Sequence, residues 1–522
     1  MMKFGAIAVI LSGVLIAASF AANQTTPKRG GVLTFGRYVD SSVLEPALNT
    51  GNPDIWVLGN IMDTLVRASL DGKKVLPGVA VSWTPAKDNL SYSFQLRRGV
   101  KFSNGAPLTA ADVKWSLERA SRKDLGFWSF ILANVKSVDV LAKNAVRVHL
   151  KTKDPVFLST MSAFNAAILP KAYFMALPGK DEAAKAKVFG EKPVGSGPFK
   201  LTSWKRGESM VLARNPNYWE KGVDGKALPY LDGVKFEIIT DDNTRILKLQ
   251  SGELDAAEYI PFSRIDELAQ DKRLKMKLFT SSEINYIAIN TRNKPLSDVR
   301  VRQALNLATD KKALVALVTF GHGKPSNGFL PSSTPLWDAS LPGYPFNLET
   351  AKKLLADAGY SDGFSMSLLV RAGSADATQL GTALQQMWAQ VGVKLEIKPV
   401  DTATQQSLEQ SNKFDAELTY WTNDINDPSE YGGYILDPSS SDSNHTGWKD
   451  DKASALFMAS QQELDPIKRK AQYQEAQKIW LEAAPFVLLY ERPFPVALGQ
   501  AVNDYAQTPL GNMVFIRAFL TR

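Results

Sequence analysis

The chain has 522 residues, of which 44% are hydrophobic and 22% are charged, as in ordinary folded proteins. This length predicts roughly two to four domains with a large core, and it argues against disorder for the bulk of the chain. There is no cysteine, which excludes disulfides and a lipid-bearing cysteine. The formal charge of +8 is spread without a block of five or more like charges, so we expect no nucleic-acid partner.

The first 21 residues are typical of a secretory signal peptide. Lys3 precedes an apolar run over residues 4–18, and a small-residue cleavage site follows, with the cut before Ala22. The apolar run is shorter than the about 20 residues that a membrane-spanning helix needs. We therefore expect a mature periplasmic protein without a membrane anchor.

The next part of the chain predicts a strand and then a compact unit of its own. Residues 32–36 favour a short strand. Residues 71–190 predict an α+β unit: Tyr92–Leu96 and residues 135–150 alternate as half-buried strands, and a capping box at Thr109 predicts the start of a helix.

The second half of the chain predicts an α/β arrangement. Residues 235–258 fit strand, helix, strand, and residues 347–421 fit β-α-β-α-β. Such an order predicts a parallel sheet wrapped by helices. Its three strands are expected at residues 366–370, 393–398 and 414–421. Near the end of the chain, residues 466–483 predict a helix and residues 486–490 a buried strand.

Polar and aromatic side chains follow two strands of that predicted sheet. The first strand runs into Arg371, and the third ends at Trp421, three residues before Asp424. Because ligands bind beyond the carboxyl ends of parallel strands, we expect these side chains at one edge. Arg371 suits a carboxylate, Asp424 an ammonium group, and Trp421 an apolar surface or a cation. The set predicts a site for a zwitterion such as a short peptide, and Asn426 and Asp427 continue the same segment as further candidates.

Each of these residues also has a purely structural interpretation. Arg371 suits a surface salt bridge, and Trp421 suits a core position. Asp424 and the pair Asp427–Pro428 suit turns. The sequence leaves these alternatives open.

The sequence carries little that is typical of an enzyme. It contains no HExxH, GxSxG or GxxxxGK[ST] motif. Its three histidines, His149, His322 and His445, are scattered, which argues against a His-built metal site. We therefore expect neither catalytic residues nor a metal or other cofactor, and a secreted hydrolase is the alternative that the sequence supports least.

Five motifs occur in fixed order along nearly the whole mature chain. They resemble the solute-binding proteins of dipeptide and oligopeptide ABC importers, the bacterial extracellular solute-binding protein family 5. The motifs are residues 96–105 (LRRGVKFSNG), 108–113 (LTAADV), 193–199 (PVGSGPF), 212–219 (LARNPNYW) and 295–305 (PLSDVRVRQAL).

The resemblance implies an α/β, bilobed periplasmic-binding-protein fold with an additional α+β domain. A two-strand hinge, near residues 282–289 and 488–498, would join the lobes and let them close around a ligand. The implied domains are residues 27–70, 193–284 and 497–522 for domain I, residues 71–192 for domain II, and residues 285–496 for domain III.

The resemblance also implies a role and a set of contacts. The protein would capture a peptide or peptide-like solute as a monomer and deliver it to a membrane ABC permease. In dipeptide-binding relatives, an aspartate three residues after a tryptophan holds the amino terminus, which matches Trp421 and Asp424. An arginine holds the carboxylate, and Arg371 falls in about that place.

Two points follow from the same resemblance. The loop at residues 38–42, with Tyr38 and Ser41, is expected to face the ligand. Relatives also bind longer peptides, glutathione, opines, oligosaccharides or nickel complexes, so the alternative to a peptide is another ligand in the same fold and transport role.

Overall fold

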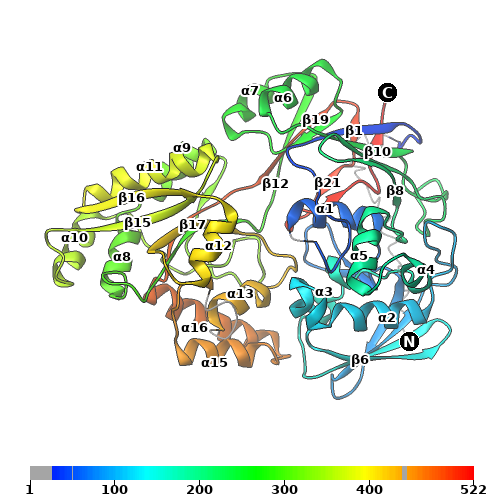
Figure 1. Ribbon diagram of the computed structural model, residues 1–522, viewed down its shortest axis with the longest axis horizontal. Helices are drawn as coiled ribbons and strands as arrows, with labels where there is room; N and C mark the ends of the chain where they lie inside the picture. Colours follow the sequence, from blue (N-terminus) through cyan, green and yellow to red (C-terminus); the bar gives the residue numbers. More distant parts are fainter. Residues whose placement is uncertain (1–25, 50, 438–443) are drawn as a thin grey trace, which may run out of the picture.

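The structure is a computed structural model that describes residues 26–49, 51–437 and 444–522. It has two lobes side by side, joined by extended strands that run between them (Figure 1). The predicted signal peptide at residues 1–21 lies outside the described residues. None of the helices in the described ranges combines the length and the apolar character that a membrane crossing requires.

The first lobe is built on a mixed seven-stranded sheet. At its centre, β1 (Val32–Arg37) pairs in parallel with β10 (Gly233–Ile238) and β11 (Ala256–Glu258), so segments far apart in the sequence form one layer. The predicted strand at residues 32–36 is thereby confirmed. Across the sheet, the strands are β12 (Leu274–Phe279), β19 (Phe494–Gly499), β11 (Ala256–Glu258), β1 (Val32–Arg37), β10 (Gly233–Ile238), β9 (Ser209–Arg214) and β8 (Phe199–Lys205). The lobe also contains α1 (Asn52–Ile61), α6 (Asp242–Ser251), α7 (Ile265–Ala269), β20 (Val502–Asn503), β21 (Ala506–Gln507), β22 (Met513–Val514) and β23 (Phe519–Leu520).

A four-stranded antiparallel sheet forms a second body on the same lobe, lower right in Figure 1. The core of this sheet is separate from that of the seven-stranded sheet, to which Trp128, Phe174 and Phe189 of the adjoining helices contribute. The predicted capping box is present, because the backbone N–H of Thr109 and that of Asp112 each bond to the other residue's side chain. The elements here are β2 (Val66–Ala68), β3 (Val75–Pro77), β4 (Ala80–Pro85), β5 (Ser91–Leu96), α2 (Ala110–Ala120), η1 (Lys123–Leu125), η2 (Phe127–Leu132), β6 (Val135–Ala142), β7 (Ala145–Leu150), α3 (Phe157–Thr160), η3 (Phe164–Ala166), α4 (Lys171–Ala176) and α5 (Glu182–Glu191).

The second lobe contains a six-stranded sheet in which β15 pairs in parallel with both β16 and β17. The predicted β-α-β-α-β unit is therefore confirmed. The strands, in order, are β14 (Lys324–Pro325), β18 (Phe486–Glu491), β13 (Ile284–Ile289), β17 (Ala416–Trp421), β15 (Phe364–Arg371) and β16 (Val393–Val400). The helices are α8 (Val299–Leu307), α9 (Lys311–Thr319), α10 (Leu348–Asp357), α11 (Ala375–Ala389), α12 (Thr402–Gln410), α13 (Ser429–Leu436), α15 (Asp451–Ser460) and α16 (Pro466–Ala483).

This sheet has a core on each face, because side chains alternate along its buried strands. In β13, Ile287 and Ile289 pack with α8, α9 and α11, whereas Tyr286 and Ala288 pack with α13, α15 and α16. The carboxyl end of β17 is thus fixed between two packed layers, and its last residue, Trp421, pairs with Ile284, the first residue of β13 after the chain enters this lobe.

Two short segments connect the lobes. Residues 280–283 lead from β12 into β13, and residues 492–493 lead from β18 back into β19. They are joined by an ion pair in which Arg492 Nε lies 2.5 Å from Glu283 Oε1. Two connections of this length suit a hinge, because a few backbone dihedrals suffice to reorient each lobe. The domain boundaries given by sequence stay predictions.

The lobes also touch away from the hinge. Asn426 Nδ2 donates to the carbonyl oxygen of Gly72 at 2.7 Å. The rings of Phe130 and Tyr434 meet edge to face, with centroids 5.6 Å apart. Residues that follow β17 in the second lobe therefore contact the first lobe directly.

Candidate functional site

A cavity of about 650 Å³ opens between the seven-stranded part and the four-stranded part of the first lobe. Its walls come from α1, from β2 and the loop after it, and from the C-terminal segment that holds β21 and β22. Asp424 borders it from the second lobe. Sites for small ligands usually occupy roughly 300–1,000 Å³, so this cavity has the size of a ligand site.

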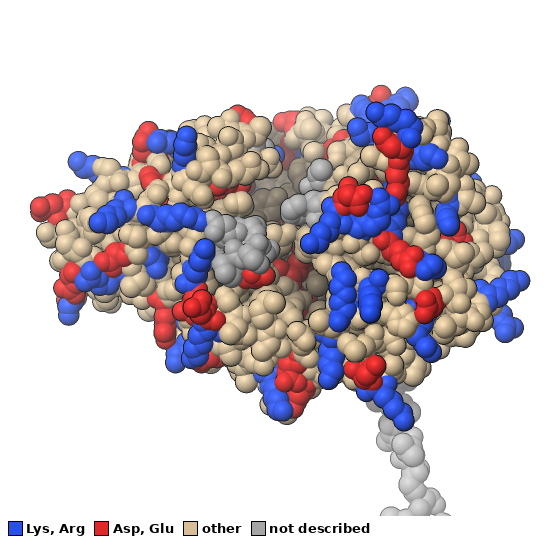
Figure 2. All heavy atoms as spheres, turned by 60° about the horizontal axis from the view of Figure 1, so that its bottom comes forward, with Lys and Arg blue, Asp and Glu red and all other residues tan. Residues whose placement is uncertain are grey.

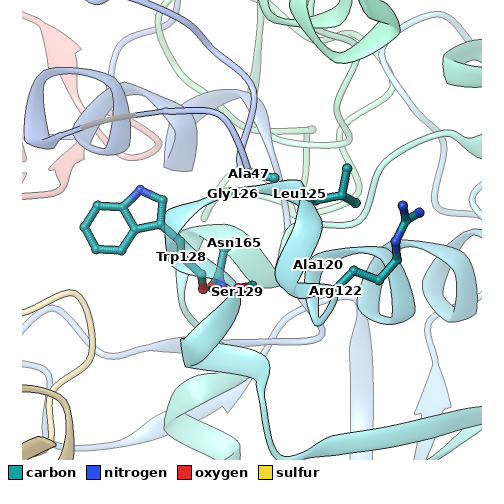
Figure 3. A pocket seen from close by; sticks show the side chains of 8 residues that line it. All are labelled: Ala47, Ala120, Arg122, Leu125, Gly126, Trp128, Ser129 and Asn165. Carbon is teal, nitrogen blue, oxygen red and sulfur yellow. Dashed lines mark hydrogen bonds between the residues drawn. The ribbon is translucent and has the colours of Figure 1, made fainter. Parts of the chain in front are cut away.

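The surface is hollowed between the two lobes, and basic and acidic side chains are interspersed on the face that Figure 2 shows. A second cavity, beside η1 and η2, has a volume of only about 10 Å³. Figure 3 shows Arg122 and Trp128 extending from it in different directions, and the indole of Trp128 is bonded to the carbonyl of Asn49. This space holds about one water molecule and is too small for a ligand.

Asp424 is a buried carboxylate without a partner. Its side chain is 7% exposed, and it forms no hydrogen bond or ion pair with any described residue. Its backbone N–H donates to Glu430 Oε2 at 2.8 Å, which holds the two acidic side chains close together. A buried carboxyl group without a partner is either protonated or paired with a bound cation, so this position suits a cationic group of a ligand.

The pKa values of this acidic pair follow from its surroundings. Burial raises the pKa of Asp424 well above its usual value, and the charge of Glu430 raises it further. Burial also raises the pKa of Glu430 to about 7, although two backbone N–H groups partly oppose this. Oε1 of Glu430 is buried without a hydrogen bond within the described residues. An ammonium group would stabilise both carboxylates.

Trp421 lies between the core and the cleft. Its ring stacks on Tyr431 with centroids 5.0 Å apart and packs against Tyr434. Its indole N–H donates to Asn423 Oδ1 at 3.0 Å. The ring is partly exposed, so it combines a packing role with an open face.

The other predicted residues of the cleft gather near the hinge. The ring centroids of Tyr38 and Tyr259, both from the first lobe, lie 4.1 Å apart. Burial raises the pKa of Tyr420, as does Glu283, whereas the nearby charges of Arg492 and Arg371 lower it. Tyr420 also raises the pKa of Tyr38, after the larger effects of burial and Glu258. Tyr38 and Arg371 thus approach the same region from opposite lobes.

Arg371 is exposed at the end of β15. Its guanidinium forms no ion pair or hydrogen bond with the residues that the structure describes, so the salt-bridge interpretation has no support there. Its charge lies near Tyr420, and an unpaired guanidinium can take a carboxylate in a bidentate pair.

Ser41 is engaged in hydrogen bonds within the first lobe. Its hydroxyl donates to the carbonyl oxygen of Pro53 at 2.7 Å and accepts from Arg37 Nη1 at 3.2 Å. Its backbone carbonyl accepts from Arg206. The polar groups of Ser41 therefore hold the loop to the first lobe, and we leave it out of the proposed ligand contacts.

Asp427 and Asn426 are also engaged within the protein. Arg469 donates to both carboxylate oxygens of Asp427, at 2.7 and 2.9 Å, in a buried bidentate pair. Asn426 donates to Gly72 across the lobes. Asp427 thus pairs with Arg469 within the second lobe, and Asn426 connects the lobes. Ligand contacts of these two side chains stay predictions, and they are not part of the contact set proposed below.

Sequence reasoning missed Tyr259, Tyr420 and Glu430. Tyr420 directly precedes Trp421 in β17, so strand alternation alone indicates that the two rings point to opposite faces. Glu430 lies in α13, and no local pattern marks its bond to the N–H groups of residues 424 and 425. Among the described residues, no group of three or more histidine, cysteine and acidic side chains has the arrangement of a metal site.

Comparison with known proteins identifies the class. Residues 74–443 match the family model described as bacterial extracellular solute-binding proteins, family 5. The chain belongs to this family, so the resemblance seen in the motifs is confirmed, and with it the predicted fold class and the role in solute binding.

Individual relatives cover most of the chain. It is 31% identical to Glutathione-binding protein GsiB of Salmonella choleraesuis over 80% of each chain. It is 27% identical to the probable D,D-dipeptide-binding periplasmic protein DdpA of Escherichia coli over 97% of each chain. A solved structure of the ABC transporter-associated periplasmic binding protein DppA from Helicobacter pylori, in complex with peptide STSA, superposes with a TM-score of 0.83 at 26% identity, covering 95% of this chain and 99% of that chain.

Proposed function

We propose that this protein is the substrate-binding component of an ABC importer and captures short peptides. The observation that carries the ligand class is Asp424, a buried carboxylate without a partner that borders a cavity of about 650 Å³. The peptide's α-ammonium binds Asp424 beside Glu430, and its carboxylate binds Arg371. Trp421 and Tyr38 cover the peptide between them.

Closure of the hinge brings these groups together. In the open state Arg371 is solvated, whereas closure around a peptide buries both charged ends and makes their pairing decisive. Ligand binding therefore shifts the population toward the closed form, which the membrane permease receives. Relatives named for dipeptides and glutathione, and a neighbour solved with a peptide, support a peptide ligand.

The remaining features of the proposal follow from its class. The protein is exported to the periplasm through the signal peptide at residues 1–21, and it works as a monomer without a cofactor or catalysis. The three domains have the boundaries given by sequence, with the peptide between domains I and III.

The test is native mass spectrometry of the mature protein as purified, followed by denaturation to release and identify its ligand. A peptide, or a ladder of peptides, is expected. A sugar or an opine as the sole ligand would leave the fold and the transport role but overturn the assignment of Asp424 and Arg371. An empty protein is then titrated with dipeptides by calorimetry, and failure of every dipeptide to bind also overturns it.

Arg371→Gln is expected to weaken binding of a free dipeptide by about 1.5–3 kcal/mol, because a charged hydrogen bond to the carboxylate is lost. Amidation of the peptide's C-terminus should weaken binding to the natural protein by a similar amount. It should have little further effect on the variant, since the two changes remove the same contact. Calorimetric titration of both peptides into both proteins measures this, with Arg147→Gln on the exposed part of β7 as the charge-matched control. If the losses of affinity caused by the substitution and by amidation add up, the contact between Arg371 and the peptide's carboxylate is contradicted.

Peptide affinity is expected to rise with pH between about 5.5 and 7.5. Without ligand, Asp424 has a raised pKa and that of Glu430 is about 7, so protons occupy the pair in this window. An ammonium group lowers both pKa values, so binding releases protons and is favoured when fewer are bound. Calorimetry in buffers of different ionisation enthalpy measures the release. Proton uptake, or affinity independent of pH, would contradict this assignment.

A further inference from the structure

Helix α1 contains a glycine, Gly59, that its local structure does not require. The position is inside the last turn and has no left-handed backbone angle. Gly59 is exposed, and a Cβ atom added there would meet no atom within 4 Å apart from its chain neighbours and the nearby backbone of its own helix. Glycine is a poorer helix former than almost any other residue, so helix propensity would favour a larger side chain and packing would not oppose one. What glycine preserves at this position is empty space.

That space belongs to the cavity that Asp424 borders. Gly59 lines it together with apolar side chains from three segments, which include Leu58, Phe164 and Leu510. A ligand whose ammonium group binds Asp424 therefore has the cavity next to its first residue. The cavity volume of about 650 Å³ far exceeds what a methyl group needs.

The basic side chains at the wall of the cavity are already paired, and one carboxylate of the wall, Asp504, is exposed to solvent. Arg67 and Arg517 each bond to a different carboxylate oxygen of Glu220, at 2.6 and 2.7 Å. The carboxylate of Asp63 accepts from the indole of Trp219 at 3.0 Å. Asp424 is the buried carboxylate of this wall that has no partner among the described residues. The wall therefore suits a ligand that places one cationic group at Asp424 and an apolar group elsewhere in the cavity.

We propose that this cavity receives the side chain of the peptide's first residue, and that it selects a large apolar side chain there. The inference rests on the proposed function, because it requires Asp424 to hold the peptide's ammonium group. Gly59 is then a specificity-determining residue, since it sets how much room the first side chain has. The preference applies to the first residue, because the second is held toward Arg371.

The experiment measures the affinities of Ala-Ala, Phe-Ala and Ala-Phe for the natural protein and for Gly59→Leu by calorimetry. The natural protein should bind Phe-Ala roughly tenfold or more tightly than the other two, as burial of a phenyl ring predicts. In Gly59→Leu, the added side chain occupies the cavity, and the ratio of Phe-Ala to Ala-Ala affinity should fall to about threefold or less. Leucine favours the helix, so the melting temperature of the variant should not fall.

Ala356→Leu, at an exposed position of α10 in the second lobe, is the matched control and should keep the natural ratio. Equal binding of the three peptides by the natural protein, or an unchanged ratio in Gly59→Leu, overturns the inference. If the peptides bind equally but depend on Asp424, the inference alone fails. If none of them binds, the proposed function fails with it.

Discussion

Asp424→Asn is expected to weaken peptide binding by about 2–5 kcal/mol, because the buried ammonium group of the ligand loses its charged partner. The same change should raise the thermal stability of the protein without ligand. Burial and Glu430 raise the pKa of Asp424 in the folded state. A carboxyl group with a raised pKa opposes folding above its unfolded pKa, so a neutral amide removes that cost at neutral pH. Calorimetry measures the first effect, and thermal unfolding of the ligand-free protein measures the second.

Opposite effects on binding and on stability distinguish a binding residue from a structural one. Asp504→Asn is the matched control, since Asp504 is an exposed carboxylate at the wall of the same cavity. This variant should change binding by less than about 1 kcal/mol, as expected for a solvated charge. A large loss of stability in Asp424→Asn, with unchanged affinity, would assign Asp424 to the fold instead.

Asp427→Ala, three residues further on, is expected to lower the free energy of unfolding by about 3–5 kcal/mol. It would leave the guanidinium of Arg469 buried after losing both of its bonds to the carboxylate. Burial lowers the pKa of Arg469, but the bonds and the charge of Asp427 outweigh this and raise it, so the pair is strongly coupled. Denaturant unfolding of the ligand-free protein measures the loss.

The double variant Asp427→Leu with Arg469→Met should recover most of that stability, because an apolar pair can replace a buried ion pair of similar volume. Any loss of peptide affinity in Asp427→Ala should be small when measured at a temperature where the variant is folded. A stable Asp427→Ala protein that no longer binds peptide would show that the carboxylate contacts the ligand after all.

The sequence predicted well where the signal is local. The β-α-β-α-β unit at residues 347–421 follows from alternation in its strands and from helix starts such as Asn347, whose side chain accepts from the N–H of Thr350. The capping box at Thr109 likewise depends on two residues in one turn. Helix caps and strand alternation act over a few residues, so they are visible before the chain folds.

The hinge and the family were also accessible from sequence, because the motifs keep a fixed order along the chain. The sequence placed Trp421 and Asp424 at the end of a strand of a parallel sheet, which is where such sheets bind ligands. It did not show which neighbouring side chains are free. Whether a side chain is free depends on partners that are distant in the sequence. The spacing of residues along the chain does not show which of these partners come into contact.

Asp424 and Asp427 show this difference most directly. Both are buried acids in one short segment, and the sequence offered both as ligand candidates, with Asp424 preferred by the resemblance. Tertiary packing gives Asp427 the guanidinium of Arg469, 42 residues later, and gives Asp424 only another carboxylate and a cavity. Local patterns and ordered motifs were enough to predict many of the elements and the family, and to propose where the site lies. Only the packed fold shows which carboxylate is unpaired and how much room lies beside it, because burial and pairing arise when distant segments pack together.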